Sequence, residues 1–169
     1  NMVNVIRSGD SYFLLGNFQG ELFYDDDRIG SSERTAGFIC LLDLSFNLLD
    51  YTFLQSQVLA TIEDADLSKD NELVIVGNFI KEIKVASKQK EGVGGNDFYV
   101  AVFDGKSSQI MLKQFNTFGD ASDESVAKVI VDGSDIYLSG IFRNEIALGA
   151  IHKKAVGSSD SFVSKTSLG

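Results

Sequence analysis

Short apolar runs alternate with polar turns along the whole chain, and this pattern predicts β-strands. The clearest run is ELVIVGNFIKEIKV, at residues 72–85. Its centre is continuously apolar, as expected of a strand that is buried on both faces. The preceding KDN, at residues 69–71, is rich in residue types that tolerate a tight turn. A further apolar run, DFYVAVFD at residues 97–104, predicts another strand of the same unit.

One phrase occurs three times in the sequence. YFLLGNF, LVIVGNF and IYLSGIF lie at residues 12–18, 73–79 and 136–142. In each copy a Phe follows the glycine by two residues, and another Phe stands about twenty residues further on. Such a pattern indicates one structural unit in tandem copies. The shared positions are Gly16, Phe18 and Phe38 in the first copy, Gly77, Phe79 and Phe98 in the second, and Gly140, Phe142 and Phe162 in the third.

Each copy divides into short strands. In the second copy the expected strands are ADLS, ELVIVGNFIKEIKV, DFYVAVFD and QIMLKQFNTF, with ASKQKEGVGGN as a loop between the second and the third. The segment DASDESVAKVIV resembles the start of a capped helix, but the register of the repeat assigns it to a first strand, and we expect a strand there.

Four antiparallel strands in one repeat unit are typical of a β-propeller blade. The expected fold is therefore all-β: a partial β-propeller of about three tandem four-stranded antiparallel blades. The blades span residues 1–58, 59–121 and 122–169, and the last is incomplete. A glycine inside a strand marks a close approach of backbones, and the repeated Phe residues are expected to fill the space between neighbouring blades.

At these positions the chain resembles the bacterial β-propeller repeat family, whose blades carry a G-N-x-Y-V-x-G-x-F strand and then a G-x-D-x-F-V-x-K strand. GSDIYLSGIF and GSSDSFVSKTSLG in the third copy are similar to these motifs, as are NELVIVGNF and GGNDFYVAVFDG in the second. The first copy departs from them, with Gly37 where the family tends to have Asp. The resemblance covers essentially the whole chain. It implies an extracellular or surface-associated bacterial module, and it brings no catalytic motif.

The expected blades leave surfaces without a partner. Closed propellers typically have ~4–8 blades, whereas this chain supplies two complete blades and part of a third. Apolar blade faces and an open sheet edge both invite association. Three explanations stay open: a segment of a longer propeller, a ring closed by several copies, or an open, capped β-array. The expected partners are the remainder of its own propeller or further copies of itself, and a protein or glycan at the cell surface.

Composition narrows the range of partners. The net charge is −9, so a nucleic acid or an anionic membrane surface would be repelled. No run of ~18 apolar residues is present, and we expect no membrane insertion. The one cysteine, Cys40, lies in an apolar run and is expected to be a buried hydrophobe. EGVGGND lacks the Lys-Ser/Thr ending of a phosphate loop, and no cofactor is expected.

Two acidic groups are weak candidates for calcium, a cation that prefers clustered carboxylate oxygens. The first is the run Asp25, Asp26 and Asp27; the alternative for it is a solvated loop between the second and third strands. The equivalent loops of the other copies are mainly basic, so no ligand set repeats. Asp120, Asp123 and Glu124 form the second group, and neither group has the spacing of an EF-hand loop. We therefore assign no metal site.

The function expected from the sequence is a non-enzymatic structural or interaction module of a bacterial cell-surface, secreted or adhesin-like protein. The alternative is a propeller-type glycan hydrolase or lyase, whose carboxylate pair would come from Asp97, Glu124 and Asp160. Asp97 and Asp160 occupy repeat positions where a turn is expected, and the only histidine, His152, is expected in a surface loop. We accordingly expect no catalytic residues.

Overall fold

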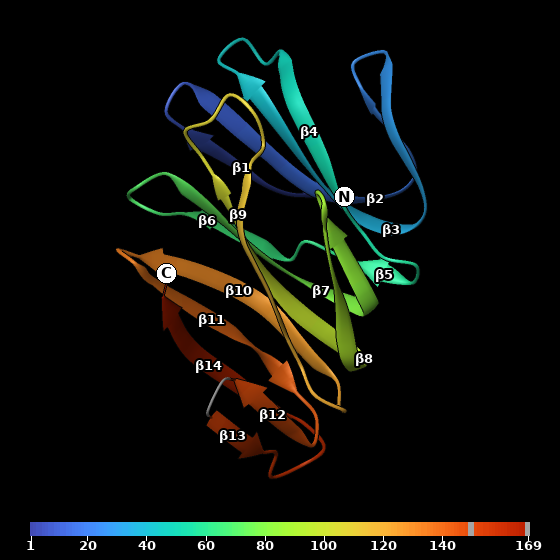
Figure 1. The fold of residues 1–169 in the computed structure, drawn as a ribbon, viewed down its shortest axis with the longest axis vertical. Coiled ribbons are helices and arrows are strands. Elements are labelled where there is room, and N and C mark those ends of the chain that lie inside the picture. Colours follow the sequence, from blue (N-terminus) through green and yellow to red (C-terminus); the bar gives the residue numbers. More distant parts are fainter. Residues whose placement is uncertain (149–150, 168–169) are drawn as a thin grey trace.

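The computed structural model describes residues 1–148 and 151–167, and the fold is all-β (Figure 1). Strands pair antiparallel throughout this part of the chain. The described residues contain no helix that is long and apolar enough to cross a membrane. The strands are β1 (Met2–Ser8), β2 (Ser11–Tyr24), β3 (Asp27–Asp43), β4 (Leu48–Gln55), β5 (Leu59–Ala60), β6 (Asp64–Leu67), β7 (Glu72–Val85), β8 (Lys88–Asp104), β9 (Leu112–Phe118), β10 (Glu124–Asp132), β11 (Asp135–Phe142), β12 (Glu145–Leu148), β13 (Ile151–Lys154) and β14 (Asp160–Ser167).

The strands form three sheet units that follow one another along the chain. The first unit pairs β1, β2, β3 and β4 in that order, and the second pairs β6, β7, β8 and β9, with β5 also on β7. The third unit pairs β10, β11 and β14, and β12 and β13 form a separate hairpin. Two residue pairs between β4 and β7 join the first two units into one sheet. Figure 1 shows the first unit at the top of the view, the second in the middle and the third at the bottom.

Two segments illustrate how well local pattern predicts a strand. The helix-like DASDESVAKVIV forms all but the last residue of strand β10, as the repeat register predicts. The expected loop ASKQKEGVGGN, in contrast, is mostly strand, because β8 already begins at Lys88. From Gln89 to Asn96 its residues alternate between exposed and half-buried, so this segment extends the β7–β8 hairpin. Its Lys and Gly content, which is unusual for a strand, concealed that alternation.

The two faces of the second unit pack against different neighbours. On β7, Leu73 and Ile75 are buried against the first unit, whereas Val74 and Val76 are buried against the third. Alternate residues of a strand point to opposite faces, so a strand between two neighbours is apolar at every position. The facing side chains include Phe13, Leu15, Ile39 and Leu41 of the first unit, and Val129, Ile136, Leu138 and Phe142 of the third.

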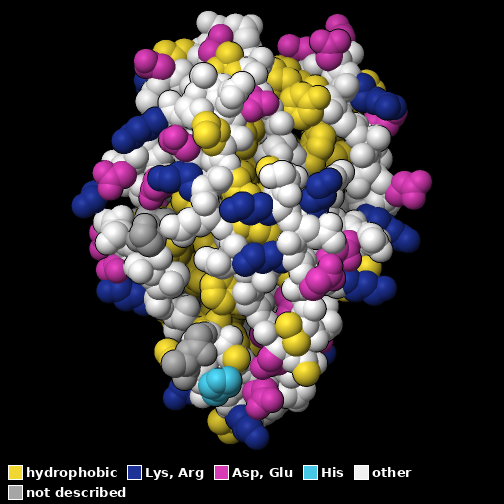
Figure 2. Space-filling view, in the orientation of Figure 1, with side chains coloured by type: hydrophobic (Ala, Val, Ile, Leu, Met, Phe, Trp, Pro, Cys, Tyr) yellow, Lys and Arg dark blue, Asp and Glu magenta, His cyan; other side chains and the backbone are white. Residues whose placement is uncertain are grey.

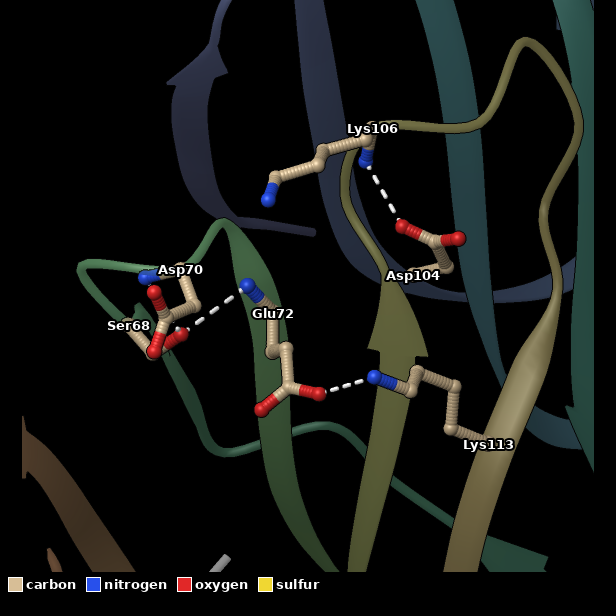
Figure 3. Close-up of polar contacts among 6 residues, drawn as sticks. All are labelled: Ser68, Asp70, Glu72, Asp104, Lys106 and Lys113. Carbon is tan, nitrogen blue, oxygen red and sulfur yellow. Dashed lines mark hydrogen bonds and ion pairs between the residues drawn. The ribbon is translucent and has the colours of Figure 1, made fainter. Parts of the chain in front are cut away.

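Polar contacts close the turn end of the second unit (Figure 3). The ammonium group of Lys113 on β9 pairs with the carboxylate of Glu72 at the start of β7, across the intervening β8. The hydroxyl of Ser68 accepts a hydrogen bond from the amide of Glu72 at 3.0 Å. The carboxylate of Asp104 accepts one from the amide of Lys106 at 2.9 Å. These bonds fix the two turns on which the strands of this unit reverse direction.

The glycine of each copy lies against an aromatic ring from the next strand. A Cβ atom on Gly16 would lie 2.6 Å from the ring of Phe38, and one on Gly140 would lie 2.7 Å from the ring of Phe162. The backbone in or just before the first strand of each unit is closer still. A Cβ atom on Gly77 would lie 1.8 Å from the carbonyl oxygen of Thr61. The repeated glycine therefore meets a steric requirement, since any side chain there would overlap both neighbouring strands.

The aromatic partner of Gly77 is Tyr99 and not Phe98. Register pairs Gly77 with Tyr99 and Asn78 with Phe98, so the expected third-strand position is displaced by one residue in the second copy. This shift places the side chain of Phe98 on the opposite face, where it stacks on Phe162 of the third unit at a centroid distance of 5.6 Å. Alignment of the three copies by sequence places Phe98 with Phe38 and Phe162. The strand register shows instead that Tyr99 is their structural counterpart.

The residue after the glycine connects neighbouring units. The side chain of Asn17 donates a hydrogen bond to the carbonyl of Ile62 at 2.8 Å and accepts one from its amide at 2.7 Å. Asn78 forms the same pair with Val126, at 3.2 Å and 2.9 Å. We call each pair an asparagine clamp. In the third unit Ile141 occupies this position, and its side chain is 54% exposed.

Aspartates on β6 add further bonds between the second and third units. The carboxylate of Asp64 accepts a hydrogen bond from the amide of Val129 at 3.1 Å, and that of Asp66 accepts one from the amide of Val131 at 2.7 Å. The first strands of these two units thus run beside each other. No backbone ladder joins β6 to β10, so carboxylates of β6 accept the hydrogen bonds of two β10 amides instead.

Candidate functional site

The first unit presents an apolar face that no other described unit covers. Phe38, Cys40 and Leu42 are buried at its base. The corresponding face of the second unit, which includes Leu73 and Ile75, is fully buried against the first unit. The partly buried side chains that surround the base are Tyr12, Leu14, Phe18, Leu22, Tyr24, Ile29, Leu48 and Phe53.

The outer part of the β2–β3 hairpin folds back over this face. Tyr24, beside the hairpin tip, donates a hydrogen bond from its hydroxyl to the carbonyl of Phe46, in the turn between β3 and β4. Both the tip and this turn lie at the top of Figure 1. Burial raises the pKa of the Cys40 thiol to about 11 and also raises the pKa of the Tyr24 phenol. Leu14 and Phe18 nevertheless stay partly exposed, so the hairpin covers the face incompletely.

The main sheet of the third unit has three strands among the described residues. Among the described strands, β14 pairs only with β11, whereas the corresponding β3 and β8 each carry one more strand, β4 and β9. A hollow of about 830 Å³ lies beside β14, lined by Leu138, Ile146, Phe162, Ser164 and Lys153 among others. Figure 2 shows hydrophobic side chains at the surface in the middle of the molecule, with Lys and Arg side chains beside them.

Asp97 is a buried carboxylate within β8, where the fully buried part of this strand begins. It is 1% exposed, and it accepts hydrogen bonds from the amides of Val93 at 3.0 Å and Gly94 at 3.5 Å. Asp160 accepts the equivalent bond from the amide of Val156 at 2.7 Å. In both copies the acceptor lies four residues after the donor. Asp160 therefore holds the backbone that precedes β14, whereas Asp97 binds residues of β8 itself, and the turn expected at Asp97 is not present.

Glu124 lies at the start of β10 and is also 1% exposed. Its Oε2 accepts a hydrogen bond from the amide of Asp120 at 3.0 Å. Oε1 of Glu124 and Oδ1 of Asp97 have no hydrogen-bond partner among the described residues. Burial, followed by the charges of Asp120 and Asp97, raises the pKa of Glu124 to about 7, and burial also raises the pKa of Asp97. Glu124 can therefore exchange a proton near neutral pH, as a general acid does.

The three carboxylates of the hydrolase alternative are distributed over two units. Phe142 of β11 pairs with Glu124 on one side and with Asp160 on the other, so these two carboxylates flank one strand of the third unit. Asp97 belongs to the second unit, and its neighbour Asn96 donates a side-chain hydrogen bond to the carbonyl of Glu124 at 2.5 Å. The structure thus brings Asp97 and Glu124 to one junction, where both are shielded from solvent.

The calcium candidates lie at a hairpin tip. Asp25 and Asp26 form the turn between β2 and β3, and both are exposed, as is Asp27. Across residues 1–148 and 151–167, no three His, Cys, Asp or Glu side chains are grouped so that they could hold a metal ion. The second acidic group, Asp120, Asp123 and Glu124, likewise forms no such cluster among the described residues. His152 is exposed on β13.

The asparagine clamps have a signal in the sequence, which is the repeated Asn of the GNF phrase. GNF occurs in the first two copies, and only its glycine and Phe were given a role. The partners of Asn17 and Asn78 lie 45 and 48 residues further along the chain, so no local pattern reveals them. The loss of this Asn in the third copy, at Ile141, was visible from the alignment of the copies alone.

Comparison with known proteins assigns the chain to no family. No protein-family model matches it, and no curated protein is significantly similar to it. The resemblance to propeller repeats therefore rests on the motifs themselves, and the function is inferred from the geometry.

Proposed function

We propose that the chain is a non-enzymatic structural or interaction module, one segment of a β-propeller-like array that continues through the apolar face of its first unit. One observation carries this proposal: Tyr12 and Leu14 occupy the repeat positions of Leu73 and Ile75, which are fully buried between units. A face built like an inter-unit interface is suited to bind another unit of the same kind. An apolar face that stays uncovered promotes unspecific association.

The remaining surface is suited to recognition. Loops and hairpin tips displayed on a rigid scaffold are where binding usually resides. The tips differ in charge, with the acidic Asp25 and Asp26 in the first unit and Lys88 in the second. By resemblance to bacterial propeller repeats, we propose an extracellular or cell-surface location and a protein or glycan partner at these tips. The net charge of −9 argues against a nucleic acid.

A glycan hydrolase or lyase is the second candidate, favoured by the raised pKa of Glu124. In that mechanism Glu124 would protonate the leaving oxygen while a second carboxylate assists. Asp97 is a candidate, but it accepts hydrogen bonds from two backbone amides of β8, and it lies inside the protein rather than in an open groove. Release of reducing ends from polysaccharides that stops in a Glu124→Gln variant would favour this candidate over an interaction module.

Sedimentation equilibrium over a wide range of protein concentrations tests the leading proposal. An exposed inter-unit face predicts that the average mass rises above 18.4 kDa with concentration. Leu14→Arg should return the mass to that of the monomer, because it places a charge in the middle of the face. Val163→Arg is the matched control, since Val163 is 78% exposed on the third unit. A mass of 18.4 kDa at all concentrations, for the unchanged chain as well, would contradict the proposal.

A further inference from the structure

We propose that a hollow between the second and third units binds a lysine side chain of a protein partner, with its ammonium group on the carboxylate of Glu124. This inference rests on the proposed function, because it names the group that an interaction module recognises. The hollow has a volume of about 420 Å³, and residues of both units line it, among them Ile80, Asn96, Glu124 and Phe142. That volume is sufficient for a small ligand or a single side chain.

The two units present these side chains to each other. Ile80 lies two residues after Asn78 on β7 and therefore points to the same face, where Asn78 binds Val126 of the third unit. Glu124 is paired with Phe142, which is buried in the core that joins these two units. The hollow is thus part of the junction between the second and third units.

The junction between the first and second units has no carboxylate at this place. Phe79 and Phe142 occupy the same repeat position, and Phe79 is paired with Ala60 where Phe142 is paired with Glu124. Ala60 is 0% exposed and Glu124 is 1% exposed. The fold accommodates an alanine here, so packing alone does not require a carboxylate. A carboxylate buried without a cation is costly, which indicates a role in binding.

One oxygen of Glu124 has no partner. Oε2 accepts a hydrogen bond from the amide of Asp120 at 3.0 Å, whereas Oε1 accepts none from the described residues. Asp97 on β8 and Asp120 before β10 place further negative charge beside it. Asp123 also lines the hollow, and its carboxylate lies 3.8 Å from the guanidinium group of Arg143. A cation on Oε1 would supply the missing hydrogen bond and offset the excess negative charge.

The cation of Arg143 is not committed to Glu124. Its side chain is 68% exposed and pairs with Asp123, which is 49% exposed. An exposed pair of this kind contributes little to stability, so the two side chains can move aside at little cost. Their displacement would open the way to Oε1, which is shielded from solvent in the free chain.

The lining favours an ammonium group on an aliphatic stem. Ile80 and Phe142 provide apolar contacts for methylene groups. The side-chain amide of Asn96 already donates to the carbonyl of Glu124 at 2.5 Å, so the hydroxyls of a sugar would find few partners. A guanidinium fork pairs best with two carboxylate oxygens, whereas Glu124 has one to offer. A lysine side chain meets these conditions.

The test is an NMR titration of the full chain with Nα-acetyl-lysine amide. At pH 8 we expect saturable shifts at Ile80 and at residues 123–126, and Nα-acetyl-arginine amide and glucosamine should bind at least about tenfold more weakly. At pH 6 the lysine derivative should bind about tenfold more weakly than at pH 8. The pKa of Glu124 is about 7, so in acid the ammonium group must displace a proton, while the lysine itself stays charged throughout.

Three variants locate the site. Glu124→Ala installs the residue type of Ala60 and should therefore fold, but it should not bind the lysine derivative. Glu124→Gln keeps the size of the side chain and should also lose binding at both pH values. Glu33→Gln, the matched control, removes the same charge from an exposed position in the first unit and should leave binding unchanged.

Three results would overturn the inference: no saturable shift at the junction, binding retained in Glu124→Gln, or equal weakening by Glu124→Gln and Glu33→Gln. Glucosamine or the arginine derivative binding as tightly as the lysine derivative would overturn the choice of lysine. Failure of the proposed function is separable, because lysine binding should be unchanged in Leu14→Arg. A chain that binds lysine but stays monomeric at all concentrations would contradict the proposed array alone.

Discussion

Asn78 holds both backbone hydrogen-bonding groups of Val126, donating to its carbonyl at 3.2 Å and accepting from its amide at 2.9 Å. Asn78 belongs to the second unit and Val126 to the first strand of the third. One side chain thus does what a pair of sheet bonds would do between strands that do not share a ladder. Asn17 and Ile62 form the same pair one unit earlier, so the clamp is part of the repeat.

Asn78→Ala should lower the free energy of unfolding by about 2–3 kcal/mol, since two hydrogen bonds are lost and the backbone of Val126 stays buried. Chemical denaturation measures the change. Asn116→Ala is the matched control, because Asn116 is exposed on β9 and should change stability little. If Asn78→Ala and Asn116→Ala lowered the free energy of unfolding equally, the asparagine clamp would contribute nothing to stability.

Gly77→Ala should destabilise the protein by about 3 kcal/mol or more, because a methyl group there would overlap the Thr61 carbonyl and the Tyr99 hydroxyl. Gly157→Ala should be nearly neutral, since no atom lies within 4 Å of its added methyl group. Thermal unfolding of the two variants compares them directly. A stable Gly77→Ala protein would contradict the close strand approach described above.

Glu124 should make stability fall as pH rises. Its pKa is raised from 4.5 to about 7 in the folded protein, so between these values the folded state holds the proton more tightly than the unfolded state. Above neutral pH the buried charge costs about 3 kcal/mol. Glu124→Gln should therefore be more stable than the unchanged protein at pH values above about 7, and the difference should vanish in acid.

Denaturation midpoints measured across this pH range test that dependence. Glu145→Gln, a change at an exposed residue of β12, is the control and should show no such pH-dependent gain. If the stability difference between Glu124→Gln and the unchanged protein were the same at every pH, the Glu124 carboxylate would not titrate between pH 4.5 and about 7.

Cys40 should report on the hairpin that covers the first unit. Burial raises the pKa of its thiol to about 11, so little thiolate is present near pH 8 and alkylation should be slow. Tyr24→Ala removes the bond from the hairpin to Phe46 and should speed alkylation. Phe23→Ala, one residue away with a side chain 52% exposed, should not. Equal alkylation rates in both variants would contradict the covering role of the hairpin.

Much of the fold follows from the sequence, because strand signals are local. The run from Glu72 to Val85 was predicted as a strand at its observed bounds, since its apolar centre and the turn before it both favour one. The β7–β8 extension was predicted as a loop because Lys and Gly concealed its alternation. The place of Tyr99 beside Gly77 depends on strand register, which two adjacent aromatic residues leave ambiguous.

The candidate site was less accessible to sequence reasoning, because its contacts join distant residues. Asp160 was predicted to have a turn role, and its bond to the amide of Val156, ahead of β14, agrees with that role. The same prediction was wrong for Asp97, which lies within β8, although it too binds a backbone amide four residues earlier. The position of Glu124 beside Asp97 and the clamp between Asn78 and Val126 require the packing of two units.

Hydrogen–deuterium exchange as a function of protein concentration tests the central claim most directly, because it locates the surface through which the chain associates. The account predicts added protection at high concentration in residues 12–18 and 38–42, which form the apolar face of the first unit. Leu14→Arg should remove that protection. Protection confined to other segments, or none at any concentration, would contradict a module that assembles through this face.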